Sequence, residues 1–270
     1  MRLSSAAAAA GHRAAEQAFR QQGSEFQINL AYLEASKQSA LDLPYGNIVA
    51  LNTHAGVLHY QHQTQDLPAP YLSLLIDAGA RAYGYASDVT RTYASKPGIF
   101  ADLIAALDDA QRSLIQTIQP GQTYLSLHEQ MHQKIGHILS DSGIVKVNGE
   151  QAYTDKLTLA FLPHGLGHLL GLQTHDVAGQ QVNKDGDTQA PPEDYAALRL
   201  TRDVEERQVF TVEPGIYFIP MLQADLAAKG LDKHINQTLL QELMPYGGIR
   251  IEDNVVVGAN QIENLTRDAF

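Results

Sequence analysis

Leu72-Ser73-Leu74-Leu75-Ile76-Asp77-Ala78-Gly79 is an apolar run that ends in an aspartate, and Asp88 follows within Gly84-Tyr85-Ala86-Ser87-Asp88-Val89-Thr90-Arg91-Thr92. Aspartate is unfavourable in strands and its charge is costly to bury, so a carboxylate that closes a buried strand needs a partner. If the chain folds back around Ala82-Tyr83, the two carboxylates meet on neighbouring strands. A cation shared between them would offset their repulsion.

Two glutamates occupy similar positions later in the chain. In Val209-Phe210-Thr211-Val212-Glu213-Pro214-Gly215-Ile216-Tyr217, the glutamate closes an apolar strand. In Gly247-Gly248-Ile249-Arg250-Ile251-Glu252-Asp253-Asn254-Val255, strict alternation places Arg250 and Glu252 on one face and the isoleucines and Asp253 on the other. Both glutamates are therefore candidates for the same site as the aspartates.

Each acid also has a simpler interpretation. Asp88 could form an ordinary ion pair with Arg91, and this alternative is slightly favoured when the two aspartates are considered alone. Arg250 and Glu252 could form a solvent-facing pair, which would contribute little to stability. These alternatives weaken because four carboxylates occur at ends or faces of predicted core strands.

Three histidines lie within Pro163-His164-Gly165-Leu166-Gly167-His168-Leu169-Leu170-Gly171-Leu172-Gln173-Thr174-His175-Asp176. The glycines disfavour a helix and allow the backbone and imidazoles to approach a ligand closely. This segment does not have the His-Glu-x-x-His spacing of helical zinc proteases. Four carboxylates would balance the charge of two divalent cations. Oxygen-rich ligation with one imidazole favours Mn²⁺, with Co²⁺, Zn²⁺ or Fe²⁺ as alternatives.

The composition limits the classes of function. The 270 residues carry a formal net charge of −11, with 44% hydrophobic and 18% charged residues and no cysteine. No apolar run reaches the ~18 residues needed to cross a bilayer, and the acidic balance argues against nucleic-acid binding. The absence of cysteine excludes disulfides and thiolate metal sites and fits a reducing cytoplasm. We expect a cytoplasmic protein that binds neither nucleic acid nor membrane.

The periodicity predicts one α+β domain over residues 1–270. Helices are predicted over 4–21, 24–36 and 99–118, and from a capping box at Ser126-Leu127-His128-Glu129 to Gly143. Strands are predicted at 48–51, 72–76, 88–93, 164–171, 209–218 and 248–257. The polar segment 183–194 predicts a long surface loop.

The quoted segments, in this order, resemble the pita-bread metallopeptidases of family M24, specifically the bacterial Xaa-Pro dipeptidases (prolidases). The resemblance extends over the whole chain and also includes Leu172-Gln173-Thr174-His175-Asp176-Val177-Ala178-Gly179. It implies an α+β pita-bread (creatinase/aminopeptidase) fold, with a curved, mostly antiparallel sheet and helices on its outer face. It also implies hydrolysis of the Xaa-Pro bond of small dipeptides, a side activity on organophosphate esters, and a homodimer.

The resemblance assigns roles to individual residues. It implies that two divalent cations are bound by Asp77, Asp88, His168, Glu213 and Glu252, with Asp88 and Glu252 bridging. It makes Glu213, His175 and His59 catalytic. The residues implied to contact the substrate are Arg199, Tyr45, His164 and Arg250. Arg199 is the expected ligand of the substrate carboxylate.

Two features of the chain depart from the family pattern. Thr174 stands where the family usually has a branched aliphatic residue. The N-terminal domain of prolidases is expected to be absent, so that residues 1–270 are the catalytic domain alone. The alternatives are a methionine aminopeptidase-like enzyme, or a pita-bread domain that is inactive without its N-terminal partner.

Overall fold

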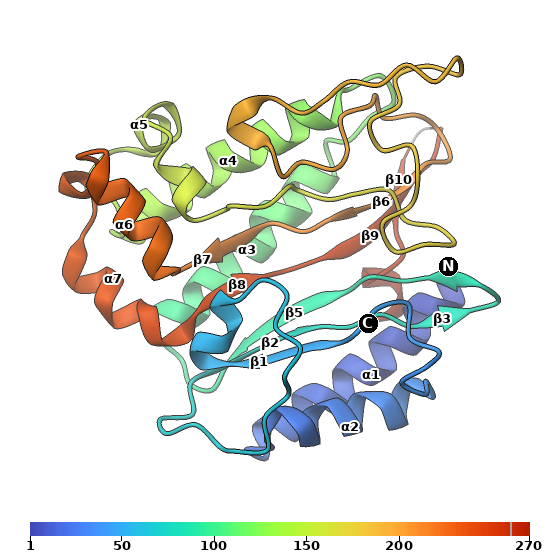
Figure 1. Cartoon of the computed structure of the whole chain (residues 1–270), viewed down its shortest axis with the longest axis horizontal. Coiled ribbons are helices and arrows are strands. Elements are labelled where there is room, and N and C mark those ends of the chain that lie inside the picture. The colour runs from blue at the N-terminus through green and yellow to red at the C-terminus, as the bar shows by residue number, and fades with distance from the viewer. Residues whose placement is uncertain (260) are drawn as a thin grey trace.

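The computed structural model describes residues 1–259 and 261–270. Figure 1 shows strands in the middle of the molecule, with α1 and α2 on one side and α3 and α4 on another. No helix in this described part of the chain is long and apolar enough to cross a bilayer.

The first half is a helical pair packed on a three-stranded antiparallel sheet. Helix α1 spans Arg2–Arg20 and α2 spans Glu25–Ser36, which begins at a capping box between Ser24 and Gln27. The sheet has the order β1-β2-β5, formed by Ile48–Leu51, Ser73–Asp77 and Thr90–Ala94. Buried Phe19, Ile28 and Tyr32 fill the space between helices and sheet, and each is at most 1% exposed.

The second half repeats this plan with a larger core. Helices α3 (Ile99–Ile115) and α4 (Tyr124–Asp141) pack beside a sheet of order β10-β9-β6. Its strands are Ile262–Asn264, Asp253–Val257 and Val209–Val212. Strand β7 (Gly215–Tyr217) pairs with β8 (Gly248–Arg250), and an antiparallel bridge between Thr90 and Glu252 joins the two halves.

The turn predicted between Asp77 and Asp88 forms with a small additional ladder. Strands β3 (Arg81–Ala82) and β4 (Tyr85–Ala86) pair around Tyr83 and Gly84, which both have positive φ. Beyond this ladder, Ala78 N–H donates to Val89 O at 2.9 Å. The two aspartates are consequently brought to the same end of the sheet, as the fold-back prediction requires.

Several sequence expectations are wrong in detail. The cap of α4 is Thr123, whose side chain accepts from Ser126 N–H, so Ser126 lies inside the helix rather than at its start. Residues 164–171 form no strand beyond one isolated bridge, Leu169 with Phe210. The segments 209–218 and 248–257 are each broken into two strands, around Glu213 and Glu252 respectively.

Three short helices were not predicted from the sequence. These are α5 (Gly149–Thr154), α6 (Pro220–Ala228) and α7 (Gln237–Leu243). The polar segment 183–194 is mostly exposed and irregular, as predicted. It ends just before Ala197 and Arg199, which line the pocket described next.

Candidate metal centre and active site

A pocket of about 480 Å³ is lined by segments from both halves of the molecule. All eleven candidate residues line it: Asp77, Asp88, His168, Glu213, Glu252, His59, His175, Arg199, Tyr45, His164 and Arg250. A larger hollow of about 860 Å³ lies between α3 and β10 and contains none of them. The chemistry-bearing side chains therefore converge on one pocket, which is not the largest hollow of the protein.

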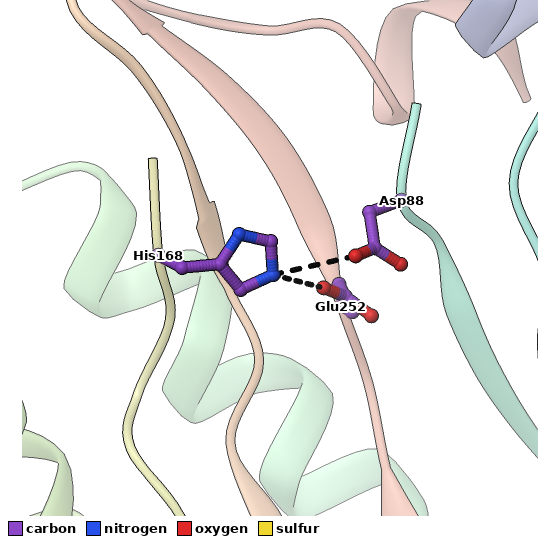
Figure 2. A group of neighbouring side chains, drawn as sticks. All are labelled: Asp88, His168 and Glu252. Atoms are coloured by element: carbon purple, nitrogen blue, oxygen red, sulfur yellow. Dashed lines mark ion pairs between the residues drawn. The ribbon is translucent and has the colours of Figure 1, made fainter. Parts of the chain in front are cut away.

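Asp88, His168 and Glu252 form the tightest group of potential ligands in the pocket. One ligand atom from each lies within 4.8 Å of the other two (Figure 2). His168 Nε2 is 3.3 Å from Asp88 Oδ2 and 4.0 Å from Glu252 Oε1. All three residues are at most 5% exposed, so their charges are poorly solvated.

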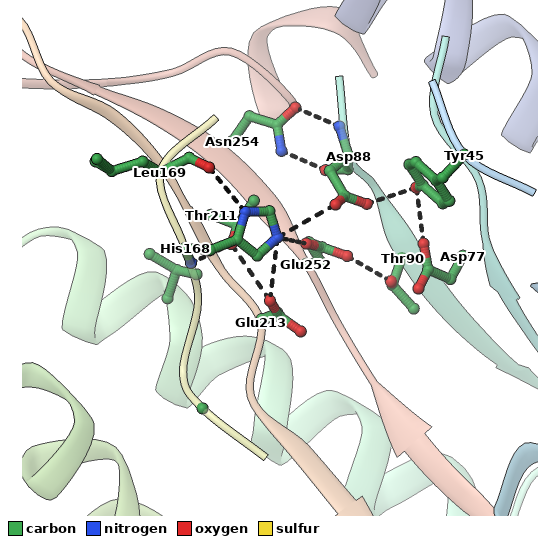
Figure 3. A network of polar contacts seen from close by, with 12 residues as sticks. Tyr45, Asp77, Asp88, Thr90, His168, Leu169, Thr211, Glu213, Glu252 and Asn254 are labelled. Atoms are coloured by element: carbon green, nitrogen blue, oxygen red, sulfur yellow. Dashed lines mark hydrogen bonds and ion pairs between the residues drawn. The ribbon is translucent and has the colours of Figure 1, made fainter. Parts of the chain in front are cut away.

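The backbone fixes the orientation of the His168 ring. Its Nδ1 lies 2.9 Å from Leu169 O, where it donates and directs Nε2 toward the carboxylates (Figure 3). The backbone N–H of His168 donates to Thr211 Oγ1 at 3.1 Å. The preceding Gly167 has no room for a Cβ, which would clash with Thr211 O and the Tyr124 hydroxyl. A hydrogen bond from the distal ring nitrogen is the usual way a metal-binding histidine is held.

Glu252 is the least compensated carboxylate of the group. Its Oε2 accepts from Thr90 Oγ1 at 2.7 Å, whereas its buried Oε1 has no hydrogen-bond partner among the described residues. Burial, followed by the charges of Asp88, Glu213 and Asp77, raises the pKa of Glu252 well above its usual range. A buried oxygen that faces other carboxylates and one imidazole fits a divalent cation, which would supply the missing charge.

Asp77 and Glu213 flank this group on opposite sides. Asp77 accepts from Tyr45 Oη at 2.7 Å and from Arg250 Nη2 at 2.8 Å, and the same tyrosine hydroxyl also contacts Asp88. Glu213 Oε1 lies 3.5 Å from His168 Nε2. Burial is the main cause that raises the pKa of Asp77 to about 6 and of Glu213 to about 7.

The two simpler ion-pair interpretations are wrong. Arg91 pairs with Asp253 at 2.8 Å rather than with Asp88, because an odd sequence separation of three places Arg91 and Asp88 on opposite sides of an extended chain. Arg250 does share a face with Glu252, yet it reaches across to Asp77 and to the Tyr217 hydroxyl at 2.7 Å.

The histidines beside the cluster are held neutral. Burial, then the neighbouring His168 and Arg199, lowers the pKa of His175 to about 4. The pKa of His59 is lowered by burial, Arg250 and Arg199. For His164, burial and Arg250 lower the pKa to about 3. Neutral imidazoles near neutral pH can donate one hydrogen bond and accept another.

Sequence reasoning missed three residues that support the site. Thr90 donates to Glu252, and Tyr217 connects Arg250 with His164 Nε2 at 2.9 Å. Asn254 accepts from the Asp88 backbone N–H at 2.9 Å through its side-chain oxygen. Each lies in the same sequence stretch as a proposed ligand and an even number of residues away from it. In an extended chain this spacing places both side chains on one face, and this was the signal that could have identified them.

A family model described as "Metallopeptidase family M24" matches residues 1–259. The chain belongs to this family. It is 50% identical over 97% of its length to an Xaa-Pro dipeptidase of Actinobacillus pleuropneumoniae, and 49% identical over 96% to one of Aeromonas hydrophila. The chain spans 60% and 59% of the length of these two relatives.

Solved structures of aminopeptidase P show the same pita-bread fold. The zinc-substituted Escherichia coli enzyme in complex with product has a TM-score of 0.79 and 25% identity, over 100% of this chain and 55% of that one. Pseudomonas aeruginosa aminopeptidase PepP has a TM-score of 0.76 and 27% identity over the same shares. The fold predicted from the sequence, antiparallel sheet segments with helices packed against them, is confirmed.

Proposed function

We propose that this chain provides the catalytic domain of an Xaa-Pro dipeptidase, which hydrolyses the Xaa-Pro bond of dipeptides. The single observation that supports this most is the Asp88–His168–Glu252 cluster, which shares one pocket with Arg199. A metal site beside an arginine suits a peptide whose free carboxylate lies close to the scissile bond. The 50% identity to a dipeptidase, against about 25% to aminopeptidase P, favours the dipeptide substrate.

The proposed cofactor is a pair of divalent cations bound by Asp77, Asp88, His168, Glu213 and Glu252. The oxygen-rich ligands favour Mn²⁺, with Co²⁺, Zn²⁺ or Fe²⁺ as alternatives. When bound, such cations supply Lewis-acid polarisation of the scissile carbonyl and an activated water. The orphaned Glu252 oxygen and the oriented His168 ring support this assignment.

The protein groups would divide the remaining work. Arg199 binds the terminal carboxylate of the dipeptide by a charge-assisted pair. His59 and His175 donate hydrogen bonds to the oxygen of the scissile carbonyl as negative charge develops there, a contribution of about 3 kcal/mol for a well-placed donor. Glu213 takes up a proton and delivers it to the departing proline nitrogen. Tyr45, His164 and Arg250 shape the pocket wall and contact the substrate.

Other activities stay open as outcomes of the same test. A methionine aminopeptidase-like enzyme would prefer a Met-initiated peptide, and a domain that needs the rest of a longer protein would bind metal and cleave nothing. Organophosphate esters are a proposed side substrate, because their tetrahedral phosphorus resembles the hydrolytic intermediate. A homodimer and a cytoplasmic location also stay predictions.

The test is Mn²⁺-dependent hydrolysis of Ala-Pro, Ala-Pro-Ala and Met-Ala-Ser by the metal-free and reconstituted protein. We expect cleavage of Ala-Pro alone, because a longer peptide places its carboxylate beyond Arg199. Arg199→Ala should raise KM for Ala-Pro by roughly 10–100-fold, the range of a lost charged hydrogen bond. Arg112→Ala, a surface arginine of α3, is the control. Preference for Met-Ala-Ser, or an unchanged KM in Arg199→Ala, would contradict the proposal.

A further inference from the structure

Glu25, the first residue of α2, has a fully buried carboxylate that is not part of the metal pocket. Buried acidic side chains are rare unless they are paired, so this one requires an explanation. It lies at the outer layer of the first half, between α2 and the chain that follows β1.

Four donors occupy the Glu25 carboxylate, two on each oxygen. Oε1 accepts from Leu51 N at 2.8 Å and lies 2.6 Å from His54 Nδ1. Oε2 accepts from the Tyr60 hydroxyl at 2.8 Å and from Thr64 N at 2.9 Å. Two oxygens of an ionised carboxylate have about four acceptor sites, so this carboxylate is saturated.

All four donors come from one continuous segment, residues 51–64. The same segment contributes Leu58, His59 and Gln61 to the wall of the metal pocket. Two of the donors precede His59 in sequence and two follow it. Glu25 therefore holds both ends of the loop that presents His59.

Neighbouring residues of the loop point in opposite directions. Tyr60 is 7% exposed, stacks on His54 with ring centroids 4.4 Å apart and bonds to Glu25. His59 beside it is exposed and lines the pocket. Anchoring Tyr60 thus constrains the backbone that sets the position of the His59 ring.

We infer that Glu25 is a positioning residue of the active site, which acts by fixing the 51–64 loop so that His59 faces the metal pocket. The inference rests on the proposed role of His59 toward the substrate. Glutamine cannot replace the carboxylate, because its NH₂ group would face two donors and leave them without an acceptor.

The test is a double-mutant cycle between Glu25→Gln and His59→Ala, measured as kcat/KM for Ala-Pro with saturating Mn²⁺. Glu25→Gln should lower kcat/KM about tenfold when His59 is present, the scale of a modest displacement of a catalytic group. In the His59→Ala background the same change should lower it less than about twofold, because the group it positions is gone. Glu34→Gln, an exposed glutamate on α2, is the matched control.

A purely structural role of Glu25 would give the same loss in both backgrounds, and that result overturns the inference. If Glu25→Gln does not fold, Tyr60→Phe removes one of the four donors and should show the same pattern with a smaller loss. Amide hydrogen exchange separates this inference from the function. If the wild-type protein cleaves no Xaa-Pro dipeptide, the exchange rates still test whether Glu25 fixes the 51–64 loop. Faster amide exchange confined to residues 51–64 in Glu25→Gln supports this role, and unchanged exchange refutes it.

Discussion

Glu252 and Asp253 are consecutive residues, both at most 1% exposed, yet they lie in opposite electrostatic environments. Glu252 faces the pocket, where its neighbours are Asp88, Glu213 and Asp77. Asp253 faces away from it and receives Arg91 at 2.8 Å, Arg267 at 2.6 Å and Asn264 at 2.8 Å. Alternation along one extended segment is enough to separate the two environments.

The difference appears in the pKa values of the two groups. Burial would raise both, and for Glu252 the neighbouring carboxylates raise the pKa further. For Asp253, Arg91 and Arg267 outweigh burial and hold the pKa below its usual value. The protein thus neutralises Asp253 with its own arginines, whereas no arginine or lysine pairs with Glu252 among the described residues. That contrast is the physical basis of the proposed metal site.

The largest expected effect follows from removing the pocket-side charge. Glu252→Gln should reduce Xaa-Pro hydrolysis by at least about 10³-fold and release metal, because a ligand is lost. The metal-free variant should be at least as stable as the wild type, because an uncompensated buried charge is removed. Steady-state kinetics, elemental analysis and urea unfolding measure the three quantities. Retained metal and turnover would exclude Glu252 as a ligand.

The matching change on the other face should do the opposite. Asp253→Asn should lower the free energy of unfolding by about 3 kcal/mol, because Arg91 loses its carboxylate partner and Arg267 keeps only Asp108 of its two, while Mn²⁺ binding persists. Asp109→Asn, an aspartate whose side chain is 72% exposed, should stay within about 0.5 kcal/mol of the wild type. Urea unfolding at saturating and zero Mn²⁺ measures both. If Asp253→Asn lost metal without losing stability, the proposed difference between the pocket-facing Glu252 and the structural Asp253 would be wrong.

A pH series on metal-free protein sharpens the comparison further. Glu213 has a folded-state pKa of about 7 against 4.5, so its protonation stabilises the fold below pH 4.5 and this contribution is lost as the pH rises toward 7. Glu213→Gln should therefore gain stability relative to the wild type between about pH 4.5 and 7, by roughly 3 kcal/mol. Buried neutral histidines without contact to Glu213, such as His12 and His128, impose the reverse trend on both proteins and cancel in the difference. His168, whose pKa Glu213 helps to raise, adds to the difference. A difference that is flat with pH would refute the pKa assignment.

The smallest expected effect concerns Thr90, the only hydrogen-bond donor to the Glu252 carboxylate among the described residues. Thr90→Val removes the hydrogen bond to Oε2 and should weaken Mn²⁺ binding about tenfold, as for other partners of metal ligands. Calorimetric titration measures the affinity. Thr53→Val, an exposed threonine outside the pocket, is the control. Equal affinities in the two variants would show that Thr90 does not support the site.

Much of the fold was predictable because strong local patterns agree with the tertiary structure. The first helix pair, β1 and the fold-back of Asp77 and Asp88 follow from apolar periodicity and capping. The carboxylate positions followed from acids that close apolar strands. The short helices α5 to α7 could not be found this way, because six to nine residues give too little periodicity.

Arginine partners were the least predictable part of the site. Arg91 pairs with Asp253, 162 residues away in sequence, and Arg250 pairs with Asp77, 173 residues away. In the sequence the nearer carboxylates are Asp88 for Arg91 and Glu252 for Arg250. The distant partners are determined by tertiary packing, which local spacing does not reveal. The contacts between Glu25 and the 51–64 loop could not be predicted either, because the four donors are backbone and side-chain groups spread over residues 51–64.

The most direct test of the account is the amount of Mn²⁺ bound per chain by three metal-depleted proteins after reconstitution and dialysis: wild type, Glu252→Gln and Asp253→Asn. We predict about two ions in the wild type and in Asp253→Asn, with a rise in Tm because the ions bind only the folded state. Glu252→Gln should lose at least one ion and most of that rise. Two results would contradict the claim that the carboxylates of the pocket bind divalent cations. These are equal metal content in Glu252→Gln and the wild type, or a wild-type Tm that does not change with Mn²⁺.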